Sequence, residues 1–280
     1  MTGREAMPPD AAPLLLVGCG KMGGALLGGW RARGLDPAAI VVVEPDAATA
    51  ARVGAAHGVR TIAAVDAVAA DFAPRVVVIA VKPQAMDAVV PAYRRFVGPD
   101  TVFLSIAAGT PIAYFSRVLG AEAAIVRAMP NTPAAIGHGI SVLVANPAVS
   151  AAQRAACGAL MAAVGDHVWV DDEGLFDAVT AVSGSGPAYV FLLIECLAEA
   201  GVAVGLPADL ATRLARTTVA GAGALALRAE QPAATLRRNV TSPGGTTEAA
   251  LAVLMAGDGL KPLITRAVAA ATARSRSLAS

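Results

Sequence analysis

Two glycine-rich segments, far apart in the chain, contain the residues whose types and spacing could carry out chemistry. The first reads Gly18-Cys19-Gly20-Lys21-Met22-Gly23, and the second reads Val240-Thr241-Ser242-Pro243-Gly244-Gly245-Thr246-Thr247-Glu248. The first matches G-x-G-x-x-G, in which backbone N–H groups at a helix start bind phosphate. The second joins flexible backbone and hydroxyls to a helix start, which favours negative charge there. Together they predict an enzyme that holds a dinucleotide in one domain and a small carboxylate in another.

The context of the first segment supports a dinucleotide site over a purely structural glycine turn. An apolar run at 14–17 predicts a strand before it, and a helix is expected from Met22 to Arg33. In such a loop the first glycine permits the tight turn, the second lets backbone approach the pyrophosphate, and the third lets helix and strand pack closely.

Glu44 ends the second predicted strand, at 40–43, and bears on the choice of cofactor. A carboxylate at this position accepts the ribose hydroxyls of NAD and repels the 2′-phosphate of NADP. Arg31, Arg33 and Arg52 are near in sequence, however, so tolerance of NADP stays open.

Later strand ends add polar and small residues where ligands bind in parallel sheets. Lys82 follows the predicted strand 76–81 and can meet a phosphate, although a solvated loop lysine is the alternative. The small residues of 105–109 leave space for a nicotinamide, and Asn131 can contact an amide or the substrate.

Composition excludes several classes of protein. The 280 residues are 56% hydrophobic and 15% charged with a net charge of +1, which gives no polyanion-binding signature and argues against nucleic acid. The most apolar run, 188–206, carries Glu195 and Glu199, so we expect no membrane span. Residues 1–13 resemble neither a signal nor a transit peptide, which favours a cytoplasmic protein.

The cysteines and histidines indicate neither disulfides nor a metal site. Cys19, Cys157 and Cys196 are isolated and read as buried thiols of a cytosolic protein. The three histidines, at 57, 138 and 167, have no cysteine or histidine at ligand spacing, so we expect no bound metal.

Apolar runs that alternate with helices predict an α/β Rossmann-type doubly wound domain at 1–171. Beyond it, a purely helical domain is expected at 172–280. Strands are predicted at 14–17, 40–43, 76–81, 102–106, 124–127, 140–144 and 167–170, and helices at 22–33, 46–57, 175–182, 187–204, 207–229, 246–256 and 260–278. Small residues in 209–229 favour close packing in a helical core or a subunit interface, and so an obligate dimer, over mere alanine richness.

These segments, in this order and with Val182-Ser183-Gly184-Ser185-Gly186-Pro187-Ala188-Tyr189 between them, closely resemble the pyrroline-5-carboxylate reductase family. The resemblance runs from about Leu14 to Arg276 and implies reduction of 1-pyrroline-5-carboxylate to L-proline, the last step of proline biosynthesis, with NADPH or NADH. It also implies a helical domain that joins two subunits into a homodimer, in some relatives a decamer. The chain departs from many relatives at Glu44-Pro45, where small polar residues are common, so a strict NADPH preference is not implied.

The resemblance also implies roles for individual residues. The cofactor would contact the loop from Gly18 to Gly24, together with Val81, Lys82, Ala107, Ala108 and Asn239, beside the Glu44 that the strand end itself indicates. The substrate would contact Glu230, Gly244, Gly245, Thr246 and Thr247, with Thr247 as the catalytic hydroxyl nearest the ring nitrogen. The alternative for Thr247 is a simple helix-start hydroxyl.

Two other functions stay open on the residues alone. A β-hydroxyacid-type dehydrogenase shares the two-domain plan but uses a lysine of the helical domain as acid and base, and the only lysine there is Lys261. A non-catalytic dinucleotide-binding regulatory protein would bind cofactor without turnover.

Overall fold

The computed structural model describes residues 11–279, and these divide into two compact units. Of the described residues, unit 1 comprises 11–184 and 272–279, and unit 2 comprises 185–271. The predicted functional boundary at 171/172 stays a prediction. By packing alone, residues 172–184 and 272–279 belong with the sheet.

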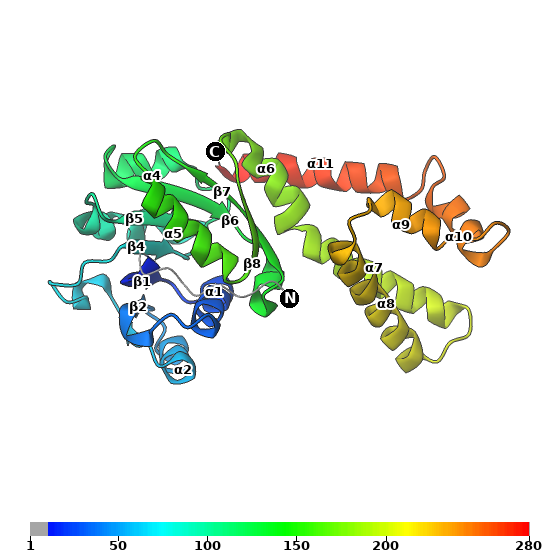
Figure 1. Ribbon diagram of the computed structural model, residues 1–280, viewed down its shortest axis with the longest axis horizontal. Helices are drawn as coiled ribbons and strands as arrows, with labels where there is room; N and C mark the ends of the chain where they lie inside the picture. Colours follow the sequence, from blue (N-terminus) through cyan, green and yellow to red (C-terminus); the bar gives the residue numbers. More distant parts are fainter. Residues whose placement is uncertain (1–10, 280) are drawn as a thin grey trace. The chain divides into compact units, whose positions relative to one another are not determined.

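Unit 1 is built on one eight-stranded sheet in the order β3-β2-β1-β4-β5-β6-β7-β8 (Figure 1). The strands are β1 Leu14–Val17, β2 Ile40–Val43, β3 Arg60–Ile62, β4 Val76–Ile79, β5 Val102–Ser105, β6 Ala124–Met129, β7 Gly139–Ala145 and β8 Gly165–Trp169. All neighbouring pairs are parallel except β6 with β7. The prediction of a mostly parallel, doubly wound sheet is therefore confirmed.

Helices cover both faces of this sheet because alternate residues of each buried strand point to opposite faces. Leu14 and Leu16 of β1 join the core under α1 (Lys21–Ala32) and α5 (Ala151–Ala162). Leu15 and Val17 join the core under α3 (Met86–Val89) and α4 (Ile112–Leu119). On the first face, the fully buried Trp30 of α1 also donates its indole N–H to the carbonyl of Leu160, 2.9 Å away.

The remaining helices are α2 in unit 1 and the C-terminal series. Their bounds are α2 Ala47–His57, α6 Phe176–Val179, α7 Gly186–Ala203, α8 Ala208–Arg228, α9 Ala233–Asn239, α10 Thr246–Leu254 and α11 Leu260–Ala279. A π-helical turn, Thr180–Gly184, joins α6 to α7. The last part of α11 belongs to unit 1, where Ser275 donates its hydroxyl to a carboxylate oxygen of Asp177 at 2.7 Å.

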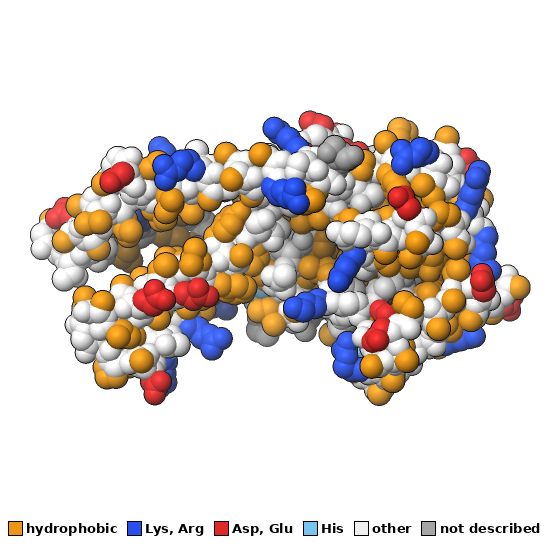
Figure 2. Space-filling model, turned by 180° about the vertical axis from the view of Figure 1, so that it is seen from behind, with side chains coloured by type: hydrophobic (Ala, Val, Ile, Leu, Met, Phe, Trp, Pro, Cys, Tyr) orange, Lys and Arg blue, Asp and Glu red, His pale blue; other side chains and the backbone are white. Residues whose placement is uncertain are grey.

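Unit 2 leaves much apolar surface uncovered. No residue of α7 is buried, and Phe191, Leu192 and Leu193 are each 45–58% exposed. Figure 2 shows hydrophobic side chains along the helices of this unit. Within the described residues, one helical run, Glu173–Ala203, is long and apolar enough to cross a membrane by length and composition. A helix covered by a partner chain meets the same criterion.

Candidate active site

The turn after β1 is fixed by Gly18. Its φ of +83° lies in the left-handed region, and a Cβ there would lie 3.0 Å from the carbonyl oxygen of Ala80. The Gly18 N–H donates to the carbonyl of Val43 at 2.8 Å, which ties the turn to the end of β2. Glycine is therefore required at this position both by conformation and by space.

The other two glycines of the motif behave as the pattern predicts. A Cβ on Gly20 would meet nothing within 4 Å, so its backbone faces open space where a ligand can approach. A Cβ on Gly23 would lie 2.5 Å from the carbonyl oxygen of Gly18, so α1 and the loop pack with no room for a side chain. Gly20 caps α1 without any side-chain hydrogen bond, which leaves first-turn N–H groups of this helix for an anion.

Glu44 lies directly beside this loop. One carboxylate oxygen, Oε2, accepts the backbone N–H of Cys19 at 2.8 Å, and the other, Oε1, accepts that of Asp46 at 3.0 Å. The side chain is buried, with 9% of the residue exposed. The predicted ribose-binding carboxylate is thus held at the carboxyl ends of β1 and β2.

The carboxyl ends of β4 and β5 provide the other predicted cofactor contacts in unit 1. Val81 lies against the loop, because a Cβ placed on Gly18 would be 3.0 Å from the Cγ1 atom of Val81. The next residue, Lys82, is exposed. Ala107 is buried and donates its N–H to the Ser105 hydroxyl at 3.3 Å, whereas Ala108 is exposed. Because β1, β4 and β5 are parallel neighbours, these residues share one edge of the sheet.

The cysteines only partly match their predicted burial. Cys19 and Cys157 are buried, and burial followed by the negative charge of Glu44 raises the pKa of the Cys19 thiol to about 11. The prediction that Cys196 is buried was wrong. This residue lies on α7, a largely apolar helix of which no residue is buried within the single chain.

The second glycine-rich loop precedes α10 and turns at Gly244, where φ is +71°. The Gly244 N–H donates to the Glu248 carboxylate at 2.7 Å, and the Gly245 N–H donates to the Ser242 carbonyl at 3.0 Å. No side chain caps α10, so the N–H groups of Thr246 and Thr247 begin the helix without a side-chain partner. These two amides form the free part of the predicted carboxylate site.

The remaining predicted residues also lie in unit 2. Thr247 is half-buried in the first turn of α10, and Glu230 is exposed after α8. Asn239 ends α9 and donates its amide to the side chain of Gln231 at 3.1 Å. The structure therefore groups the predicted cofactor residues in unit 1, with the exception of Asn239, and the predicted substrate residues in unit 2.

Two polar contacts near the strand ends were missed by sequence reasoning. Arg127, in the middle of β6, pairs with Glu173 at 2.7 Å, and Glu173 also accepts the N–H that starts α4, that of Ile112, at 2.9 Å. Asn131 accepts the N–H of Ile140 at 3.0 Å and donates to the Ser183 hydroxyl at 3.3 Å. A charged residue inside the otherwise apolar strand AIVRAM was a signal that could have revealed the first contact.

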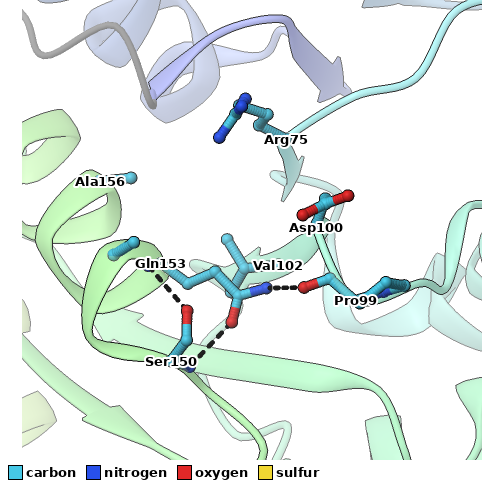
Figure 3. A pocket seen from close by; sticks show the side chains of 8 residues that line it. Arg75, Pro99, Asp100, Val102, Ser150, Gln153 and Ala156 are labelled. Carbon is cyan, nitrogen blue, oxygen red and sulfur yellow. Dashed lines mark hydrogen bonds between the residues drawn. The ribbon is translucent and has the colours of Figure 1, made fainter.

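The cavity drawn in Figure 3 is not at this edge of the sheet. It is lined by Arg75, Val102 and Gln153 among others, and its volume is about 60 Å³. Arg75 precedes β4 and Val102 begins β5, so the cavity lies at the amino ends of the parallel strands. Gln153 donates to the Pro99 carbonyl at 3.1 Å and belongs to the capping box that starts α5, which gives these side chains a structural role.

Comparison with known proteins finds two family models that match separate parts of the chain. Residues 173–278 match the family model described as pyrroline-5-carboxylate reductase dimerisation, and residues 14–109 match that of NADP oxidoreductase, coenzyme F420-dependent. A pyrroline-5-carboxylate reductase from Pseudomonas aeruginosa is 44% identical over 95% of this chain and 96% of its own. The chain belongs to the pyrroline-5-carboxylate reductase family.

Solved structures of this family have the same fold. That from Coxiella burnetii has a TM-score of 0.90 at 36% identity, covering 96% of this chain and 99% of its own. That from Plasmodium falciparum, solved with NADP bound, has a TM-score of 0.81 at 28% identity, covering 97% and 99%. The predicted Rossmann-type domain and helical dimerisation domain are confirmed, and the match to a dimerisation domain supports a homo-oligomer.

Proposed function

We propose that this chain reduces 1-pyrroline-5-carboxylate to L-proline, with NADPH or NADH as the hydride donor. Membership of the reductase family carries the proposal, since a curated relative is 44% identical over 95% of the chain. The geometry of the loop at Gly18, Gly20 and Gly23 supports a dinucleotide in unit 1. The same membership favours this reaction over a β-hydroxyacid-type dehydrogenase.

The residues of the second loop provide what the substrate requires. The N–H groups of Thr246 and Thr247 bind the substrate carboxylate at the positive end of α10, and Gly244 adds its own N–H once Glu248 moves away. The hydroxyl of Thr247 hydrogen-bonds the ring nitrogen. Glu230 and Gly245 complete the pocket, and Asn239 faces the cofactor.

A strong general acid is not needed for this reaction. The nicotinamide supplies the hydride when it is bound. A cyclic imine binds already protonated or takes its proton from water, so the protein has to orient the substrate and keep its charge paired. This agrees with a substrate set that contains threonine, glycine and one glutamate.

We also propose a cytoplasmic homodimer formed through the helical domain, which in turn builds a larger ring such as a decamer. The exposed apolar residues of α7 support this assembly, because a monomer would leave them in water.

The assay that tests the function follows oxidation of NADH and of NADPH by purified protein, with and without pyrroline-5-carboxylate. We expect substrate-dependent oxidation and formation of proline in equal amounts. Cofactor binding without turnover would instead support the non-catalytic alternative.

Replacing Thr247 by alanine is expected to lower kcat about 10- to 100-fold, because one hydrogen bond to a charged group contributes about 1.5–3 kcal/mol. Steady-state kinetics would measure kcat, and fluorescence titration would show NAD(P)H affinity within about twofold of the unsubstituted protein. Thr247→Ser keeps the hydroxyl and should retain most of the activity. Equal losses of turnover and cofactor affinity in Thr247→Ala would remove Thr247 from the reaction and leave it as a helix-start residue.

A further inference from the structure

The position of Glu44 restricts which dinucleotide this chain can accept. Its two carboxylate oxygens accept the N–H groups of Cys19 and Asp46, at 2.8 and 3.0 Å, and only 9% of the residue is exposed. A carboxylate has about four lone-pair sites, so each oxygen can still accept one further hydrogen bond. The side chain is therefore fixed beside the loop with acceptor capacity to spare.

The negative charge of Glu44 acts on the groups around it. Both of its hydrogen bonds come from backbone N–H donors, those of Cys19 and Asp46. The pKa of the neighbouring Cys19 thiol is raised to about 11, first by burial and then by the negative charge of Glu44. Any group that approaches the loop from the carboxyl end of β2 thus meets a fixed anion.

Two of the three arginines near Glu44 in sequence, Arg31 and Arg33, form hydrogen bonds elsewhere. Arg31 donates to the carbonyls of His57 and Leu35, and Arg33 donates to the carbonyl of Ala162 at 3.3 Å. Arg31 lies in the last turn of α1 and Arg33 caps its C-terminal end, whereas the cofactor loop precedes its first turn. They are therefore engaged away from the site that their proximity in sequence suggested.

Arg52 is the arginine that acts on this region. It lies on α2, and its positive charge offsets a small part of the rise in the Cys19 pKa and adds a small part to the lowering of the Asp46 pKa. Asp46 caps α2 by accepting the backbone N–H of Thr49 at 2.8 Å. Hydrogen bonding from the Thr49 side chain, followed by this backbone bond, is the main cause of the lowered pKa of Asp46. Arg52 is thus the arginine near two carboxylates, Glu44 and Asp46, and it forms a hydrogen bond with neither of them among the described contacts.

We propose that Glu44 makes this chain prefer NADH and discriminate against the 2′-phosphate of NADPH. The ribose 2′-hydroxyl of NADH would donate to the free lone pair of the carboxylate. A 2′-phosphate has no proton to donate at neutral pH and would place like charges together at a partly dehydrated site. This inference rests on the proposed function, because it assumes that the chain binds a nicotinamide dinucleotide. The preference between NADH and NADPH is a property of binding and can be measured without turnover.

Direct binding measurements test the preference without depending on turnover. Titration of the purified protein with NADH and with NADPH, in the same low-salt buffer, should give a Kd for NADH at least about tenfold lower. Glu44→Gln keeps the length of the side chain and removes its charge, and it should reduce the Kd ratio at least about tenfold. Equal or tighter binding of NADPH by the unsubstituted protein, or an unchanged ratio in Glu44→Gln, would overturn the proposal.

Asp46→Asn is the matched control, because it removes a neighbouring negative charge while asparagine still caps the helix. We expect Asp46→Asn to change the Kd ratio less than threefold. A change equal to that of Glu44→Gln would show that any negative charge in this region sets the preference, and not Glu44 in particular. The ratio is the decisive readout, since a loosened loop would weaken both cofactors together.

Turnover distinguishes this inference from the proposed function. A protein that prefers NADH but oxidises neither cofactor with pyrroline-5-carboxylate would refute the reaction and keep the preference. A protein that reduces pyrroline-5-carboxylate faster with NADPH, as judged by kcat/KM, would keep the reaction and refute the preference.

Discussion

Gly23→Ala is expected to weaken binding of either dinucleotide about 100-fold. The added Cβ would lie 2.5 Å from the carbonyl oxygen of Gly18 and 3.3 Å from the Cβ of Ala80. Neither neighbour can move easily, because the Gly18 N–H is bound to Val43 and Ala80 directly follows β4. The helix must therefore shift relative to the loop, and a displacement of about 1 Å in a binding element can cost about 100-fold.

Gly28→Ala provides the comparison on the same helix. A Cβ at Gly28 would come no closer than 3.7 Å to the ring of His57, which is ordinary van der Waals contact. This variant should bind NADH as the unsubstituted protein does and gain about 0.5–1 kcal/mol from the better helix propensity of alanine. Isothermal titration and urea unfolding of both variants would check the pair, and intact cofactor binding by a folded Gly23→Ala protein would refute the close-packing argument.

Glu173→Ala is expected to destabilise the protein by about 3–5 kcal/mol, because it leaves the charge of Arg127 buried without its partner. The Arg127 side chain is 7% exposed, its NH1 group bonds Glu173 at 2.7 Å, and its Nε atom has no hydrogen-bond partner. The guanidinium also lies 4.5 Å from the centre of the Phe176 ring. The same substitution removes the acceptor for the N–H of Ile112.

Arg127→Met should cost clearly less than Glu173→Ala. Methionine fills similar volume with no charge, and Glu173, whose side chain is 29% exposed, keeps both water and the Ile112 N–H as partners. The double variant should be more stable than Glu173→Ala alone. Urea unfolding at one fixed protein concentration measures all three, and fixed concentration matters because a homo-oligomer gains stability by association. A larger loss in Arg127→Met would contradict this account.

Much of the fold could be predicted from sequence because its strands are continuous apolar runs. The predicted strands match β1, β2 and β4 to β8 with small shifts at their ends. The strand β3 was missed because it is only three residues long, half-exposed and at the sheet edge, so it has no apolar run. The helix α9 was missed because its seven residues are mostly small or charged and none is buried.

The candidate site was predictable where backbone chemistry demands a residue type. Gly18, Gly20 and Gly23 follow from the motif, and the structure has a left-handed turn at Gly18, open space at Gly20 and close packing at Gly23. The hydrogen bonds of Glu44 to Cys19 and Asp46 could not be predicted, since they depend on how the ends of β1 and β2 lie side by side. The exposure of Cys196 could not be predicted, because an apolar helix that is uncovered in the single chain has the same sequence pattern as one buried in its own core.

The return of α11 to unit 1 makes the sheet domain discontinuous in the gene. Residues 272–279 complete a unit whose other residues end at 184, and Ser275 closes it through Asp177. During synthesis the sheet can form its strands early, but its final segment leaves the ribosome last, after the entire helical insertion. A fragment that stops at the end of the strands would thus carry the whole nucleotide-binding motif and still lack a piece of its own domain.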